Sequence, residues 1–402
     1  MLEKGLTTYF ETYLKKDSHI FKNKEALQSK YTPHTVPHRE EELEKVAHIL
    51  APALKLQKPS TLLIYGKTGT GKTLAITHVT DKLNEIAKEK KLPLKIVYLN
   101  CKMKRVSDTE YRLVAELAKQ LGVEVPETGL PTKQVYEIFI KAVEKEKILF
   151  IMILDEIDQL VKKIGGDIIY NLTRLNQSLS KSEISFIGIT NDLKFKEFLD
   201  SRNISSLNDE GILFPPYDAI QLCDILEKRA KIAFKDGTYG EELLKKCAAY
   251  AAKEHGDARR ALDLLRLAGE LAERKGANLI STNILDEAFD KLGTDYIIEA
   301  VSKQPTHSKF VVYSIMSTLE NKDSTETGVV FDKYLKNCGA NKQKPLTQRR
   351  VSDLITELDT LGIISATTIS HGRYGKTRNI RSLIPPSTTP KLMKLLKEDL
   401  DL

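Results

Sequence analysis

One eight-residue segment constrains the fold of this 402-residue chain more than any other feature. It fits the pattern GxxxxGK(S/T), follows an apolar run at 61–65 that predicts a strand, and begins a helical pattern that extends to residue 91. A loop in this position directs backbone N–H groups and the positive end of the helix dipole at phosphate oxygens. We therefore expect a nucleotide-binding α/β core whose phosphate loop consists of Gly66, Lys67, Thr68, Gly69, Thr70, Gly71, Lys72 and Thr73.

Two carboxylates follow the longest apolar run of the chain, Ile148–Leu154, which predicts a buried strand. Asp155 and Glu156 come directly after it, at the edge of a parallel sheet where ligands bind. We expect Lys72 to contact the β- and γ-phosphates of ATP, and Thr73 and Asp155 to hold Mg²⁺. Glu156 would be catalytic and polarise the attacking water. The alternative is a strand end that simply carries charge at the surface.

The next strand end supplies a candidate catalytic amide. The apolar run at 184–189 is followed by Thr190 and Asn191, so Asn191 is expected beside the same site, where it could orient the water or contact the γ-phosphate. The alternative is a turn formed by Asn191 and Asp192. Asp158, the last residue of the sequence DEID, is expected only to begin the next helix.

Apolar periodicity divides the chain into three parts. Between residues 31 and 215, short apolar runs alternate with helical patterns, which is typical of a parallel sheet with helices on both faces. From 216 to 293 only helical periods occur, and glycines stand where helices are expected to end. We predict an α/β core with an N-terminal extension at 1–215, an all-α domain at 216–293 and a third domain at 294–402.

Composition excludes several classes of protein. Hydrophobic residues make up 41% of the chain, enough for folded cores, but no apolar run approaches the ~18 residues of a membrane span. Four cysteines without a CxxC pair argue against a disulfide framework or zinc ribbon and fit a reducing cytosol. The net charge is +7, and residues 301–402 hold 16 Lys and Arg against 10 Asp and Glu. This fits a polyanionic partner; the alternative is a solvated basic surface.

The third domain has the order of a winged helix, with helices near 310–319, 331–338 and 346–362 followed by a hairpin. Apolar positions of the third helix leave its first turn exposed, where recognition helices carry residues that reach base edges. The Gly-rich hairpin turn could follow phosphates or enter a minor groove. A winged helix that docks a protein is the alternative. Candidate DNA-binding residues are Thr347, Gln348, Arg349, Arg350 and Ser352 of the helix, and Arg373, Tyr374, Lys376 and Arg378 of the wing.

Together these motifs resemble a known family. The phosphate loop, the DEID sequence and the strand that ends at Asn191 are typical of AAA+ ATPases. Further phrases resemble those of archaeal Orc/Cdc-type replication initiators, relatives of the eukaryotic origin recognition subunits: YTPHTVPHREEEL from Tyr31, FPPY from Phe214, GDARRALDLLR from Gly256 and LTQRRVSDLITELDTLGII from Leu346. The resemblance covers about residues 5 to 385 and implies an AAA+ core, an α-helical lid and a C-terminal winged helix.

Several residues acquire roles from this resemblance alone. Arg259 matches a catalytic lid arginine, called sensor 2, that touches the γ-phosphate, and Arg202 matches an arginine that reaches the ATP of a neighbouring subunit. Eukaryotic subunits often carry a second arginine where this chain has Ser206, and many relatives carry a proline where it has Lys67. Nucleotide contacts are implied for Tyr217 and Arg229 and, in the segment that covers adenine, for Val36, Pro37 and Arg39; Lys133, in an extra helix at 126–137, is implied to contact DNA.

The resemblance implies a weak ATPase that binds double-stranded origin DNA, helps recruit the replicative helicase and acts with other initiator paralogues on DNA. Its implied cofactors are ATP or ADP and Mg²⁺, and its implied location is the cytoplasm, at the nucleoid and away from membranes. Two alternatives stay open. A clamp-loader or helicase-loader subunit would share the core and lid but gives no reason for a basic wing. An ATP-controlled transcription regulator would bind DNA without mechanical work.

Overall fold

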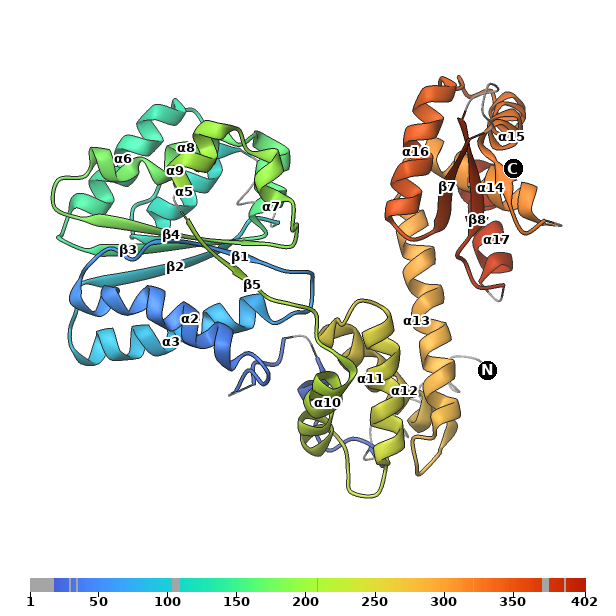
Figure 1. Cartoon of the computed structure of the whole chain (residues 1–402), viewed down its shortest axis with the longest axis horizontal. Helices are drawn as coiled ribbons and strands as arrows, with labels where there is room; N and C mark the ends of the chain where they lie inside the picture. The colour runs from blue at the N-terminus through green and yellow to red at the C-terminus, as the bar shows by residue number, and fades with distance from the viewer. Residues whose placement is uncertain are drawn as a thin grey trace, which may run out of the picture. The chain divides into compact units, whose positions relative to one another are not determined.

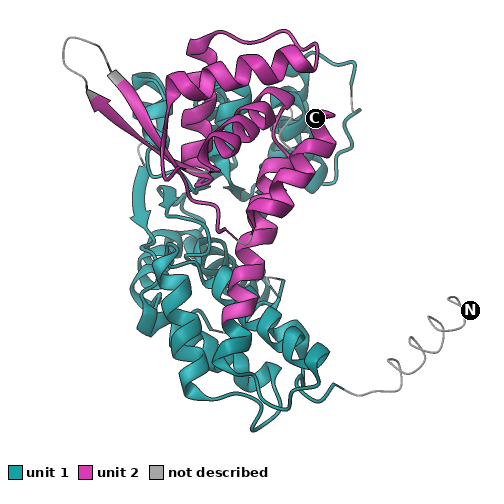
Figure 2. Ribbon diagram, turned by 90° about the vertical axis from the view of Figure 1, so that its right-hand side faces the viewer, with its two compact units in different colours: residues 1–285 teal, residues 286–402 magenta. Residues whose placement is uncertain are grey.

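The computed structural model describes residues 18–402 except 29, 34, 103–108, 127, 208, 321, 371–375 and 387. The chain forms two units, residues 1–285 and 286–402 (Figure 2). Each unit has a hydrophobic core of its own. Within the described ranges, every helix is too short or too polar to cross a membrane.

A five-stranded parallel sheet forms the centre of the first unit, in the order β2-β3-β4-β1-β5. The four strands that apolar runs predict are all present, which confirms the α/β core. The edge strand β5 is not predicted from the sequence, because only Ile212 within it is buried. The strands are β1 (Thr61–Tyr65), β2 (Leu94–Asn100), β3 (Leu149–Asp155), β4 (Glu183–Thr190) and β5 (Asp209–Leu213).

Helices cover both faces of this sheet (Figure 1). Alternate residues of β3 enter the two cores, Ile151 on one face and Met152 on the other, so the strand is apolar throughout. One face carries α2 (Glu40–Leu50) and α3 (Lys72–Glu89), and the other carries α5 (Glu110–Gln120), α6 (Thr132–Glu144), α7 (Ile157–Ile164), α8 (Asp167–Thr173) and α9 (Ser201–Leu207).

A helical bundle, the lid, completes the first unit, and the N-terminal segment packs on it. The ring of Phe21 lies 5.1 Å from that of Phe234 and fills the space beside Gly269. Lys22 and Asn23 donate backbone hydrogen bonds to the Ala233 carbonyl at 2.8 and 3.0 Å. From residue 18 on, the described chain therefore packs first on the lid, crosses to the sheet at α2 and returns to the lid after β5. The lid helices are α10 (Ala219–Ala233), α11 (Glu241–Lys253) and α12 (Ala258–Lys275).

The second unit is a winged helix with a core of its own. Its three-stranded antiparallel sheet has the order β6-β8-β7, and Leu392 and Leu396 bury the last helix in the core. The two-residue strand β6 is too short to be predicted from periodicity. The elements are α14 (Thr306–Leu319), β6 (Thr325–Glu326), α15 (Thr327–Ala340), α16 (Gln348–Thr360), β7 (Ile364–Ser370), β8 (Lys376–Ser382) and α17 (Thr389–Leu400).

A single long helix, α13 (Thr282–Ser302), joins the two units. The predicted domain boundary after residue 293 falls inside it, and the units themselves divide at residue 285. Gly293 does not end the helix, because Ile297 and Val301 continue the apolar period into the core of the second unit. One glycine inside a helix costs only about 1 kcal/mol, which such packing can offset.

Phe21→Ala tests whether the N-terminal segment stabilises the lid. Loss of this buried ring leaves a cavity beside Phe234, and we expect the free energy of unfolding to fall by about 3–5 kcal/mol in urea titrations. Phe198→Ala is the matched control, because that ring is 50% exposed; its expected cost is under about 1 kcal/mol. Equal losses in the two variants would contradict the packing role of Phe21.

Candidate functional site

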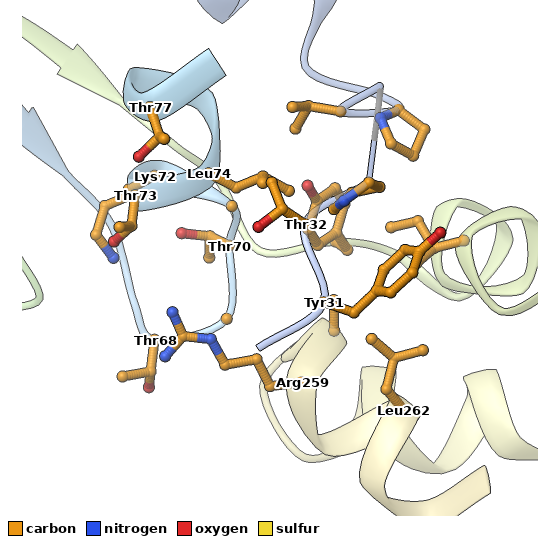
Figure 3. Close-up of a pocket in the computed structure, with 18 of the residues that line it drawn as sticks. Tyr31, Thr32, Thr68, Thr70, Lys72, Thr73, Leu74, Thr77, Arg259 and Leu262 are labelled. Atoms are coloured by element: carbon orange, nitrogen blue, oxygen red, sulfur yellow. The ribbon is translucent and has the colours of Figure 1, made fainter. Parts of the chain in front are cut away.

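A pocket in the first unit lies where the phosphate loop, the ends of β2, β3 and β4, the N-terminal segment and the lid meet (Figure 3). Most of the predicted nucleotide-site residues line it. They are Val36, Pro37, Thr68, Gly69, Thr70, Gly71, Lys72, Thr73, Asp155, Glu156, Asn191, Tyr217, Arg229 and Arg259.

Two positions of the phosphate loop require glycine, because the backbone there is left-handed and a Cβ atom would clash with neighbouring side chains. Gly69 and Gly71 have φ angles of +71° and +91°, in the left-handed region that favours glycine. A Cβ atom at Gly71 would lie 2.7 Å from the Tyr217 hydroxyl, and one at Gly69 would lie 1.7 Å from Oδ1 of Asp257. The lid, which carries Asp257, is therefore in direct contact with the loop.

Lys72 is buried beneath the loop and directed towards β4. Its Nζ donates to the carbonyls of Gly66 and Lys67, both at 2.7 Å, and to Oδ1 of Asn191 at 2.8 Å. Burial lowers the pKa of Lys72 to about 8, against the opposing charge of Asp155. A phosphate group beside this ammonium would supply the negative charge that favours its protonated form.

A hydroxyl and a carboxylate lie together at the end of β3. Thr73 Oγ1 donates to Oδ2 of Asp155 at 2.7 Å, and the Tyr98 hydroxyl donates to the same oxygen at 2.7 Å. Hard oxygen donors of this kind are the ligands that Mg²⁺ prefers, so Thr73 and Asp155 fit the predicted metal site. Tyr98, on β2, is absent from the sequence prediction, since no local motif identifies it.

Glu156 directly precedes α7, as its N-cap residue, and has a left-handed conformation with a φ angle of +54°. This backbone is uncommon for a residue with a side chain and costs of order 1–3 kcal/mol. Its side chain is 20% exposed, and its Oε2 lies 3.8 Å from Nζ of Lys102. Glu156 lines the pocket beside Asp155, as the sequence predicts.

Asp158 has a larger part in the site than its predicted place at a helix start. It is buried, and its Oδ1 accepts hydrogen bonds from Thr190 Oγ1 at 3.1 Å and from the backbone N–H of Asn191 at 3.3 Å. These bonds hold the end of β4, and the Asn191 side chain that follows this strand accepts a hydrogen bond from Lys72. Asp158 therefore contacts the residue that the sequence predicts to be catalytic.

The lid contributes two arginines at different ends of the pocket. Arg259 extends from α12 towards Thr68 and Thr70 of the loop (Figure 3). Arg229 is buried over the ring of Tyr31 at 4.4 Å and donates to the Tyr31 carbonyl at 3.2 Å. Burial lowers the pKa of Arg229. Four apolar or lysine side chains that the sequence prediction omits also line this part: Ile225, Lys228, Ile232 and Leu262.

Four predicted site residues lie outside the pocket lining. Gly66 and Lys67 support the loop through their carbonyls, which accept from Lys72. Arg39, which is expected to contact nucleotide, is 1% exposed, and its Nε donates to the Thr70 carbonyl of the loop. Arg202, on α9, has a 75% exposed side chain that pairs with Asp200 at 2.9 Å.

The exposed start of α16 is the candidate nucleic-acid interface of the second unit. Thr347 precedes the helix and its side chain accepts from the Arg350 amide at 3.4 Å. Gln348, Arg349 and Arg350 are exposed, and Ser352 is half-buried. In the first unit, Lys133 is exposed in the first turn of α6. Val351, Leu354, Ile355 and Leu358 bury the opposite side of α16.

Arg378 links the C-terminal hairpin to α16. From β8, its Nη1 donates to the Ser352 carbonyl at 3.2 Å and to Thr356 Oγ1 at 2.6 Å. The predicted wing contacts Arg373 and Tyr374 lie outside the described residues. The side chain of Lys376 also lies outside them.

Family models match three parts of the chain. A model described as "Cdc6 AAA+ ATPase-type lid domain" matches residues 223–290, "CDC6, C terminal winged helix domain" matches 299–391, and "AAA domain" matches 55–194. These ranges coincide with the lid, the winged helix and most of the α/β core.

Curated relatives and solved structures agree with these models. The chain is 47% identical to the ORC1-type DNA replication protein of Thermococcus kodakarensis over 386 residues, 95% of this chain and 92% of the relative. It is 48% identical to ORC1-type DNA replication protein 1 of Archaeoglobus fulgidus, covering 94% and 91%. The solved Aeropyrum pernix ORC1 protein in complex with DNA is 41% identical, with a TM-score of 0.83 over 96% and 98% of the two chains. This chain belongs to the ORC1/Cdc6 family of AAA+ replication proteins.

Proposed function

We propose that this protein is an ATP-binding, slowly hydrolysing replication initiator that binds double-stranded origin DNA at the nucleoid and helps recruit the replicative helicase. The observation that carries this is the pocket itself, in which Lys72, Asp155 and Arg259 come together from loop, strand and lid. The second unit presents a basic helix start on a winged helix. The Aeropyrum pernix relative, 41% identical, was solved in complex with DNA.

Side chains of the pocket divide the work of ATP hydrolysis. The loop amides and Lys72 would hold the phosphates, and Asn191 would accept from Lys72 or from the water. Glu156 would accept a hydrogen bond from the attacking water, and Arg259 would balance charge on the γ-phosphoryl group. Thr73 and Asp155 would hold Mg²⁺, which when bound supplies positive charge to the phosphates.

The position of Arg202 supports slow hydrolysis by the chain alone. This arginine lies outside the pocket lining, on α9, and its side chain is 75% exposed. An arginine that contacts the γ-phosphate bound by a neighbouring subunit must be exposed on the surface of its own subunit. We therefore propose that paralogues assembled on DNA supply this group to one another, although Ser206 replaces a second arginine.

Double-stranded DNA would contact two parts of the protein. The exposed first turn of α16 would enter the major groove, where Arg349 or Arg350 can read guanine and Gln348 can read adenine. Arg373, Tyr374 and Lys376 of the wing would follow phosphates or the minor groove. Lys133, exposed in the first turn of α6, would add a contact from the first unit.

Nuclease footprinting on chromosomal DNA separates this function from its alternatives. Protection of origin-proximal sites supports an initiator. Protection confined to promoters would support a transcription regulator, and the absence of protection with any nucleotide would support a loader that acts through proteins.

Lys72→Ala should weaken ADP binding about 10- to 100-fold, because the variant lacks the buried ammonium that faces the phosphates. Titration with fluorescent ADP measures this change. Lys82→Ala, on the exposed side of the same helix, is the matched control and should keep the affinity of the natural protein. Unchanged affinity in Lys72→Ala would place the phosphates elsewhere.

Glu156→Gln should retain ATP and stop turnover, because the amide keeps the shape of the side chain but is a poor acceptor for a proton of the water. The measurements are ATP affinity and release of inorganic phosphate. Glu85→Gln, on the exposed surface of α3, should change neither. Continued phosphate release by Glu156→Gln would remove Glu156 from catalysis.

Arg349→Ala should weaken duplex binding and flatten the slope of log K against log salt by about one, because one phosphate or base contact and its released counterion are lost. Fluorescence anisotropy at several salt concentrations gives this slope. Lys394→Ala removes an 80% exposed cation from α17 of the same unit and should leave the slope unchanged. If both variants gave the same slope, Arg349 would not contact DNA and the proposed binding by α16 would be contradicted.

A further inference from the structure

Arg39 is a fully buried cation directly behind the phosphate loop. Only 1% of its surface is exposed, yet it carries a charge whose burial costs several kcal/mol unless hydrogen bonds compensate. Its N–H groups donate hydrogen bonds to three backbone carbonyls. Nε donates to that of Thr70 at 2.9 Å, Nη2 to that of Pro215 at 2.5 Å and Nη1 to that of His38 at 3.2 Å. Its carboxylate contact is longer, at 3.5 Å to Glu42.

The same guanidinium stacks on the segment that leads into the lid. Its central carbon lies 3.9 Å from the ring centroid of Tyr217 and 5.7 Å from that of Phe214. The Tyr217 hydroxyl lies in turn against Gly71, where a Cβ atom would approach it to 2.7 Å. Arg39 therefore contacts the phosphate loop and the hinge of the lid at once, without lining the pocket.

The bond to Thr70 determines which way the loop amide points. The Thr70–Gly71 peptide is trans, so its carbonyl and its N–H point in opposite directions. With the carbonyl directed to Arg39, the Gly71 N–H points away from Arg39, and Gly71 itself lines the pocket. Such an orientation must be imposed, because glycine peptides rotate with little steric resistance.

We infer that Arg39 is a positioning residue that locks the phosphate loop in its binding conformation and joins it to the hinge of the lid. It acts through the Thr70 carbonyl and does not touch nucleotide. The inference rests on the proposed nucleotide binding at this pocket. A purely structural arginine would stabilise the fold without favouring one nucleotide over another.

Comparison of ADP with AMP separates the two roles, because AMP lacks one of the phosphates that the loop holds. In Arg39→Met, which keeps the apolar stem, we expect the Kd for ADP to rise about tenfold and the preference for ADP over AMP to fall by a similar factor. Arg39→Lys keeps the charge but has no planar fork, and it should show a smaller loss in the same direction. Calorimetric titration measures both affinities.

Glu42→Gln is the matched control. It removes the carboxylate partner of Arg39 but leaves the three carbonyl bonds, so the preference for ADP should equal that of the natural protein. Circular dichroism establishes that each variant is folded. An unchanged preference in folded Arg39→Met and Arg39→Lys would overturn the inference. So would failure of both variants to fold, because Arg39 would then be needed for the fold itself. If the natural protein bound no ADP, the proposed function would fail instead.

Discussion

The parallel register of β1, β3 and β4 is the constraint on which the nucleotide site depends. Tyr65 lies beside Thr190, and Asp155 lies beside Ile189, so the loop, the carboxylates and the polar tip of β4 leave the sheet at one edge. A slip of one residue would turn each buried side chain to the other face. The apolar cores on both faces of the sheet therefore fix the strand register, and the register fixes the positions of the site residues at the strand ends.

Features encoded by adjacent residues were predictable from the sequence. The phosphate loop has a spacing of glycine and lysine residues that is rarely found except between a strand and a helix. The apolar strand before Asp155 identifies the edge of the sheet where the carboxylates lie. The winged helix was predictable because the periodicity of α16 separates a buried side from an exposed first turn. The inner strands match their patterns closely, whereas α13 continues past Gly293, where a break was expected, and the polar edge strand β5 carries too little apolar character to be recognised.

Features that depend on distant partners could not be predicted. Asp158 accepts a hydrogen bond from the backbone N–H of Asn191, which is 33 positions away. Arg39 donates to the carbonyl of Pro215, which is 176 positions away. Arg378, which is expected to contact DNA, donates to the Ser352 carbonyl and the Thr356 hydroxyl and so links β8 to α16. In each case the hydrogen-bond partners of a charged side chain are brought to it by the fold. A single sequence does not show which distant residues those partners are.

The double passage of the chain between lid and sheet has a mechanical consequence. Segments near Tyr31 and near Tyr217 both connect the lid to the α/β core, and both line the pocket. Two connections restrict the relative movement of lid and core more than one connection would. A molecule bound in the pocket would contact both connections at once, so its binding would be coupled to the position of the lid.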